Sequence, residues 1–266
     1  MSQGPPRIFD SHALRLHRER ARRIAGDAFL RHEAAEGIAE RLGAVQRRFA
    51  HVLDVDAALG AGERLAAAPE AFDLATSVLS LHTANDLPGV LAQTRRALRP
   101  DGLFLAALFG GETLTELRQS LAAAEIQVRG GLSPRVAPFG DVRDLGGLLQ
   151  RAGFALPVAD VERTVVRYSD GLSLMRDLRA LGETNALAER SRKPMTRTLL
   201  AAVLAHYAAH FADPDGKLRA TFDIVYLTGW APHESQQQPL KPGSAKARLA
   251  EALGTAERDA GEKAGG

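Results

Sequence analysis

The run FDLATSVLSLH at residues 72–82 and the run LFLAALF at residues 103–109 decide the fold class of this 266-residue chain. The second run is wholly apolar, the first is apolar at six of its eleven positions, and both are short and bounded by turn residues. Such runs are typical of strands buried on both faces of a parallel sheet. A similar run, HVLDVD at residues 51–56, ends in two acids. A stretch with helical spacing of its apolar residues follows the second run, so the sequence predicts an α/β fold with a mainly parallel sheet and helices on both faces.

The remaining elements extend outward from these runs. We predict helix over residues 11–49, in two pieces around Gly26 or Gly37, and a turn at residues 99–102 (RPDG) that stops the helix before the third strand. Further helices are predicted at 87–98, 112–124, 141–152, 172–181 and 196–211, and further strands at 158–168 and 222–229. The expected organisation is a helical segment at 1–49, an α/β domain at 50–231 with a helical insertion at about 171–212, and a polar tail at 232–266.

Composition excludes several classes of protein. With 45% hydrophobic and 25% charged residues the chain is expected to be globular and soluble, and no apolar run approaches the ~20 residues that cross a bilayer. The absence of cysteine excludes disulfides, thiolate metal sites and cysteine nucleophiles. A net charge of +2 and a basic N-terminal helix without interleaved aromatics give no reason to expect nucleic acid as a partner.

The location of the protein is predicted from its first residues. Five arginines lie between Arg15 and Arg23, as in a mitochondrial presequence. Such leaders avoid acids, whereas Asp10, Glu19 and Asp27 interrupt this one, so we predict a cytoplasmic protein with a solvated basic helix.

Polar residues at the ends of the predicted strands form the first candidate site. Ligands of open α/β sheets bind beyond the carboxyl ends of the strands, which selects Asp54 and Asp56 after the first strand and His82 after the second. The acids could hold a cofactor or be ordinary polar residues at a strand end. An imidazole at His82 could act as a base or a ligand, or have no chemical role.

Several segments together resemble the class I S-adenosylmethionine-dependent methyltransferases. The run FDL at 72–74, the pair LH at 81–82, the run NDLP at 85–88 and the run LRPDG at 98–102 are similar to the middle of that superfamily. The runs LTELR (114–118), SPRVAPF (133–139), GETNA (182–186) and GWAPHESQQ (229–237) resemble bacterial relatives of the methyltransferase-like assembly factors of respiratory complex I. The resemblance spans roughly residues 7–250. The resemblance implies kinship with a branch of the superfamily that hydroxylates arginine. The malonyl-carrier-protein methyltransferases are a more distant resemblance.

The chain departs from the superfamily at its first loop. There the resemblance implies a glycine-rich turn, because the cofactor approaches the backbone closely and a side chain would block it. It also implies an acid about twenty residues later that binds the ribose of the cofactor. Here Ala57 and Ala58 stand in that turn, and only Gly60 and Gly62 match it. The interval between Asp56 and residue 72 is long enough for one short crossover only. It is too short to contain a further strand that would carry the ribose-binding acid. We therefore expect Asp54, Asp56, Gly60, Gly62 and His82 to be the residues that bind S-adenosylmethionine, in a shortened site.

Three further residues are candidates for binding a substrate. Glu183 and Asn185 lie in the GETNA run between two predicted helices, where they either face a substrate or form a cap and turn. Arg135 in the SPRVAPF run either binds a carboxylate or an acidic protein surface, or is an ordinary surface arginine.

No metal site is expected. His206 and His210 lie one helical turn apart, but no HExxH pattern accompanies them. An iron site built from His82, His233 and Glu234 has the right residue types but no supporting spacing.

Two functions follow as expectations. The first is a methyltransferase-family protein that acts on or binds a protein partner, with complex I assembly as the implied setting. The second is a non-catalytic relative that kept the sheet, lost the cofactor pocket and serves as an assembly factor or as a subunit of a larger complex.

Overall fold

The computed structural model describes residues 7–24 and 28–237. The chain divides into two units, Met1–Pro232 and His233–Gly266, and the helices and strands of the described residues belong to the first. Expectations for the tail beyond residue 237 lie outside the described residues. The elements are α1 Ser11–Ala21, α2 Phe29–Gly43, β1 Val52–Asp54, α3 Val55–Ala58, η1 Ala61–Glu63, β2 Phe72–Val78, η2 Leu81–Thr83, α4 Leu87–Ala97, β3 Leu98–Gly110, α5 Thr115–Arg129, α6 Val142–Arg151, β4 Ala155–Tyr168, α7 Gly171–Leu181, α8 Arg197–Phe211 and β5 Leu218–Trp230, over the described residues.

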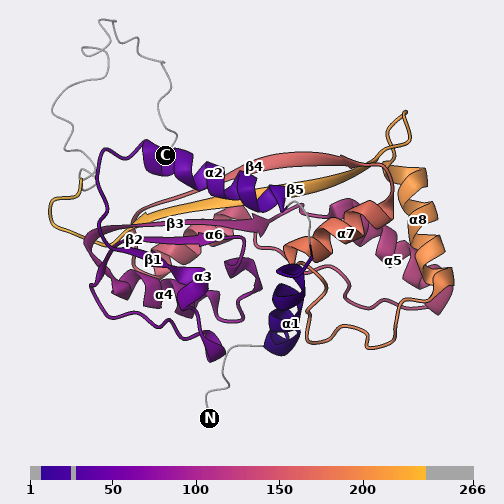
Figure 1. Cartoon of the computed structure of the whole chain (residues 1–266), viewed down its shortest axis with the longest axis horizontal. Helices are drawn as coiled ribbons and strands as arrows, with labels where there is room; N and C mark the ends of the chain where they lie inside the picture. The colour runs from indigo at the N-terminus through magenta and orange to yellow at the C-terminus, as the bar shows by residue number, and fades with distance from the viewer. Residues whose placement is uncertain (1–6, 25–27, 238–266) are drawn as a thin grey trace, which may run out of the picture. The chain divides into compact units, whose positions relative to one another are not determined.

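Five strands form one sheet in the order β1-β2-β3-β5-β4 (Figure 1). The first three run parallel, and β5 pairs antiparallel with both β3 and β4. The expected α/β sheet with helices on both faces is confirmed, with its parallel part limited to the three strands that the apolar runs predicted. Strand β1 has three residues and lies at one edge of the described sheet.

Alternating residues of the central strand divide the core into two layers. Leu103, Leu105, Ala107 and Phe109 share one cluster with α2, α5, α7 and α8, whereas Phe104, Ala106 and Leu108 share the other with α4 and α6. This alternation follows from the two-residue period of a strand. The uninterrupted apolar run at 103–109 thus reflects burial of β3 on both faces.

The two N-terminal helices separate between Ala21 and Phe29, in agreement with the first of the two predicted positions, and Gly37 lies inside α2. Two boundaries differ from expectation. Helix α2 ends at Gly43 rather than near residue 49. The RPDG run does not separate a helix from a strand: β3 already begins at Leu98, and the run forms an irregularity in its pairing with β2. Asp101 sits there at φ 61°, a left-handed conformation that Asp tolerates better than most residues.

No helix in the described parts of the chain combines the length and the apolar character needed to cross a membrane.

Candidate functional site

The two acids after β1 are used to build the local fold. Asp54 caps the short helix α3, with Oδ1 accepting a hydrogen bond from the Ala57 amide at 3.0 Å. Asp56 points toward β2, where its two oxygens accept from Ser77 Oγ at 2.5 Å and from the Val78 amide at 2.8 Å. Burial raises the pKa of Asp56, against the opposing effect of these hydrogen bonds. Asp56 therefore fastens α3 to β2.

The loop after α3 folds onto the end of β2. Gly60 is extended, and Gly62 has φ 68° with no atom within 4 Å of where a Cβ would lie. Beside them, Glu63 accepts hydrogen bonds from the backbone amides of Asn85 and Asp86, both at 2.6 Å. The Glu63 carboxylate thus accepts hydrogen bonds from the two backbone amides that immediately precede α4.

These residues do not fit S-adenosylmethionine. Both oxygens of Asp56 are engaged by β2, and Ala57 donates its amide to Asp54. Within the described residues, β1 pairs only with β2, so no further strand is present to carry an acid for the ribose hydroxyls. Gly62 has φ 68°, a left-handed backbone angle that by itself accounts for glycine at this position.

His82 forms a buried pair with Glu183. The imidazole side chain is 1% exposed and its Nε2 lies 3.1 Å from Glu183 Oε2. Its ring packs edge-on against Phe109 at 5.1 Å between centroids and lies 6.0 Å from the ring of Phe139. Burial by itself raises the pKa of Glu183, but His82, Arg18 and Arg31 outweigh it and the pKa is lowered. Glu183 is therefore a carboxylate at neutral pH.

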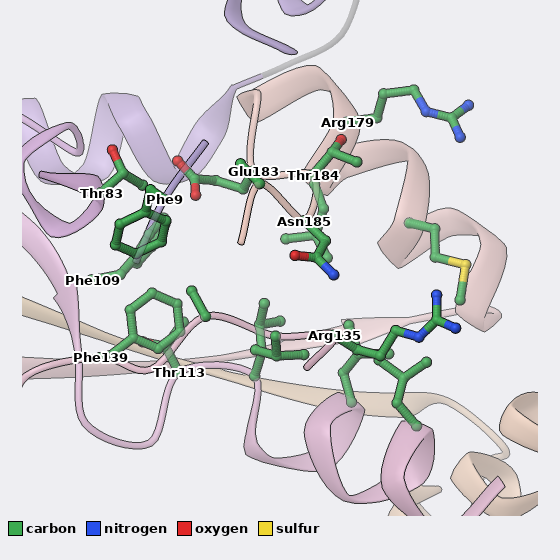
Figure 2. Close-up of a pocket in the computed structure, with 18 of the residues that line it drawn as sticks. Phe9, Thr83, Phe109, Thr113, Arg135, Phe139, Arg179, Glu183, Thr184 and Asn185 are labelled. Carbon is green, nitrogen blue, oxygen red and sulfur yellow. The ribbon is translucent and has the colours of Figure 1, made fainter. Parts of the chain in front are cut away.

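Glu183 lines a cavity of about 390 Å³ between the ends of β3 and β5, helices α5 and α7, and two loops (Figure 2). The walls are largely apolar. Phe9, Phe109 and Phe139 lie at the same end as the Glu183 carboxylate, and Arg135 lies at the other end, with Asn185 between them. A mainly apolar cavity of this size with a few convergent polar groups is the usual form of a small-ligand or side-chain binding site.

Arg135 belongs to the cavity wall and is also tied into the fold. Its guanidinium donates to Glu125 Oε1 from Nε at 2.9 Å and from a terminal nitrogen at 2.6 Å. The same carboxylate accepts from the amide and hydroxyl of Ser133. Glu125 thereby holds the loop 130–139 against α5, which fixes one side of the cavity.

Asn185 joins the two loops that face each other across the cavity. Its Nδ2 donates to the Pro134 carbonyl at 2.9 Å, and its Oδ1 accepts from the Leu187 amide at 3.0 Å. Both ends of its side-chain amide are thus engaged in holding the cavity together.

The structure therefore separates the predicted residues into two groups. Arg135, Glu183 and Asn185 line the cavity. His82 is not a lining residue but hydrogen-bonds to Glu183, which is. Asp54, Asp56, Gly60 and Gly62 are not among the residues that line it. Sequence reasoning missed the aromatic wall, because the backbone of Phe9 is held there by hydrogen bonds with the side chain of Asn85, 76 residues away.

No metal site is found in residues 7–24 and 28–237: no three His, Asp or Glu side chains there gather around a common point. His206 and His210 stack ring on ring at 4.1 Å, and His206 Nδ1 lies 3.2 Å from Ser120 Oγ.

Comparison with known proteins agrees with this architecture. A family described as "Methyltransferase domain" matches residues 28–106. Arginine-hydroxylase NDUFAF5, mitochondrial, of Dictyostelium discoideum is 46% identical over 186 residues, covering 70% of this chain and 43% of the relative. The Homo sapiens protein of the same name is 46% identical over 180 residues, covering 68% of this chain and 52% of the relative. Malonyl-[acyl-carrier protein] O-methyltransferase of Laribacter hongkongensis is 39% identical over 181 residues, covering 68% and 58%.

The cytoplasmic location predicted from the N-terminal acids is wrong by this comparison. The relatives that share 46% of the aligned residues are mitochondrial proteins by name, which points to mitochondria instead. The prediction relied on a rule for presequences, and an arginine-rich helix with a few acids does not separate the two locations.

The chain spans about half the length of the arginine-hydroxylases that it matches. The matched part of the chain is similar to both groups of relatives. Residues 28–106 therefore carry a methyltransferase domain, and the chain is related in sequence to both the mitochondrial arginine-hydroxylases and the malonyl-[acyl-carrier protein] O-methyltransferases.

Proposed function

We propose that this chain binds an arginine side chain of a partner protein in the cavity beside Glu183, and that it does so without S-adenosylmethionine. The observation that carries the proposal is the placement of the Glu183 side chain at the aromatic end of a mainly apolar cavity. The proposed setting is mitochondrial, as for the NDUFAF5 relatives.

The chemistry of the cavity suits a guanidinium group. A guanidinium is planar, always charged and weakly hydrated, so it both pairs with carboxylates and stacks on aromatic rings. Among the described residues only His82 donates a hydrogen bond to the Glu183 side chain, at Oε2. The second oxygen is left for a ligand, next to the rings of Phe9, Phe109 and Phe139.

His82 is proposed to position Glu183. A carboxylate that faces an apolar cavity on a loop needs a partner that fixes its rotamer, and the buried imidazole supplies one. The relatives support the choice of ligand, because two of them are named arginine-hydroxylases. Loss of the cofactor loop favours binding over methyl transfer, which agrees with the second of the two functions expected from the sequence.

Calorimetric titration with N-acetylarginine amide tests the proposal. We expect saturable binding that weakens about 10- to 100-fold in Glu183→Gln, because a hydrogen-bonded charge pair is lost while the shape of the side chain is kept. N-acetylcitrulline amide, which has the same shape without the charge, should not bind detectably. The matched control is Glu36→Gln, which removes an exposed carboxylate on α2 and should leave binding unchanged.

Equal binding of the citrulline and arginine compounds would contradict the proposal. So would unchanged affinity in Glu183→Gln when circular dichroism shows that the variant is folded. A loss of the same size in Glu36→Gln would show that the effect is one of overall charge.

A further inference from the structure

Three cationic residues line the cavity or lie within two positions of a residue that lines it. Arg179 lines the cavity, and its side chain extends outward from α7 (Figure 2). Lys193 and Arg197 flank Met195, another lining residue, and both are exposed. No carboxylate within the described residues forms an ion pair with any of these three cations. The rim therefore carries uncompensated positive charge.

Two nearby acids, Glu125 and Asp10, are paired with arginines within the fold. Glu125 is 1% exposed and is held by Arg129 and Arg135, while Asp10 accepts from Arg190 at 3.0 Å. Residues 171–197 contain six cations against three carboxylates, one of which is Glu183 inside the cavity. Helix α1, with three arginines and one glutamate between positions 15 and 21, packs against α7.

Apolar side chains are exposed next to the same cations. Leu132, in the loop that leads to Arg135, is 66% exposed, and Met195 and Val128 are each 36% exposed. Arg129 donates to the Pro194 carbonyl at 3.1 Å, which brings the end of α5 beside Met195. Exposed apolar residues beside a charged rim are typical of a surface that receives another protein.

From this we infer that the rim formed by Arg179, Lys193 and Arg197, with Leu132 and Met195, docks an acidic segment of the partner protein that presents the arginine. The inference rests on the proposed function of the cavity. A lone guanidinium approaching this rim meets like charges, whereas carboxylates on either side of it pair with the rim and guide it in. The surface would thus select an arginine by its acidic neighbours.

Peptide titrations at two salt concentrations test the inference. Three short peptides share a central arginine, with flanks rich in Asp and Glu, in Asn and Gln, or in Lys. We expect the acidic peptide to bind about tenfold more tightly than the neutral one at about 50 mM salt, and this advantage to disappear near 500 mM, because exposed charges are screened. The lysine-flanked peptide should be the weakest.

Two triple variants with the same change of net charge locate the effect. Arg179→Gln with Lys193→Gln and Arg197→Gln should abolish the advantage of the acidic peptide. Arg96→Gln with Arg143→Gln and Arg151→Gln removes three exposed cations from α4 and α6, which cover the other core layer, and should preserve it.

Each failure has its own signature. Equal affinity for acidic and neutral peptides, or equal losses in both triple variants, would overturn the docking surface while leaving the arginine cavity intact. Capture of the protein by phosphatidylserine vesicles, lost in the first triple variant without any preference among peptides, would assign the basic rim to a membrane and overturn the inference. If the acidic peptide binds equally well with citrulline in place of its arginine, the docking surface stands and the proposed function of the cavity fails.

Discussion

Glu125→Ala is expected to lower the free energy of unfolding by about 3–5 kcal/mol, because it leaves a largely buried arginine without its counter-charge. The Glu125 side chain is 1% exposed and that of Arg135 is 13% exposed. The carboxylate also accepts hydrogen bonds from the amide and hydroxyl of Ser133. Urea unfolding measures the change. Gln119→Ala, at an exposed position of the same helix, is the control and should change stability by less than about 0.5 kcal/mol.

The same residue predicts a dependence of stability on pH. Burial raises the pKa of Glu125, but the hydrogen bonds of Ser133 and Arg135 outweigh it and hold the pKa below the ordinary value of 4.5. The stabilisation is therefore complete above pH 4.5 and is lost as the pH falls through the folded-state pKa. The difference in unfolding free energy between the natural protein and Glu125→Gln should be largest near neutral pH and shrink in acid. A difference that grows in acid would contradict this pairing.

Gly37→Ala is expected to destabilise the protein by about 1–3 kcal/mol through overpacking. A Cβ at Gly37 would lie 2.2 Å from Tyr226 Oη and 2.5 Å from Cζ, closer than atoms pack. The ring cannot move away easily, because Tyr226 is 1% exposed and the Arg41 guanidinium covers it at 3.5 Å from the centroid. Helix α2 must then shift away from β5.

A second glycine of the same helix provides the control for this prediction. Gly43 ends α2, and a Cβ there would meet nothing within 4 Å. Gly43→Ala should therefore be neutral or stabilise the protein by up to about 1 kcal/mol, through the higher helix propensity of alanine. Urea unfolding of both variants decides the matter. Equal stabilities would show that α2 does not pack closely on Tyr226.

The fold could be predicted largely from local patterns. The apolar runs at 72–78 and 103–109 became β2 and β3, since burial on both faces leaves a clear trace in the sequence. The predicted turn at RPDG between a helix and a strand was wrong, because turn residues also form irregularities inside strands. Only the pairing of β2 with β3 distinguishes a turn from such an irregularity.

The site could be predicted only in part. The runs at 133–139 and 182–186 were expected to face a substrate, and the structure brings Arg135 and Glu183 to one cavity. Asp56 was expected to end the first strand, but it lies in α3, two residues beyond β1. Whether its carboxylate faces a ligand or β2 depends on Ser77, which no local pattern connects to it. The aromatic wall joins residues about a hundred positions apart and leaves no signal in a single sequence.

We propose that the cavity beside Glu183 binds arginine and that the loop after β1 does not bind S-adenosylmethionine. The protein should therefore bind an arginine compound and fail to bind the cofactor. Equilibrium dialysis of the full chain against S-adenosylmethionine, with N-acetylarginine amide run in parallel, tests this most directly. We predict saturable retention of the arginine compound and no retention of S-adenosylmethionine at millimolar concentration, in protein shown to be folded. Micromolar retention of S-adenosylmethionine that is abolished by Asp54→Ala would contradict the account, because the shortened loop would then still form a cofactor site.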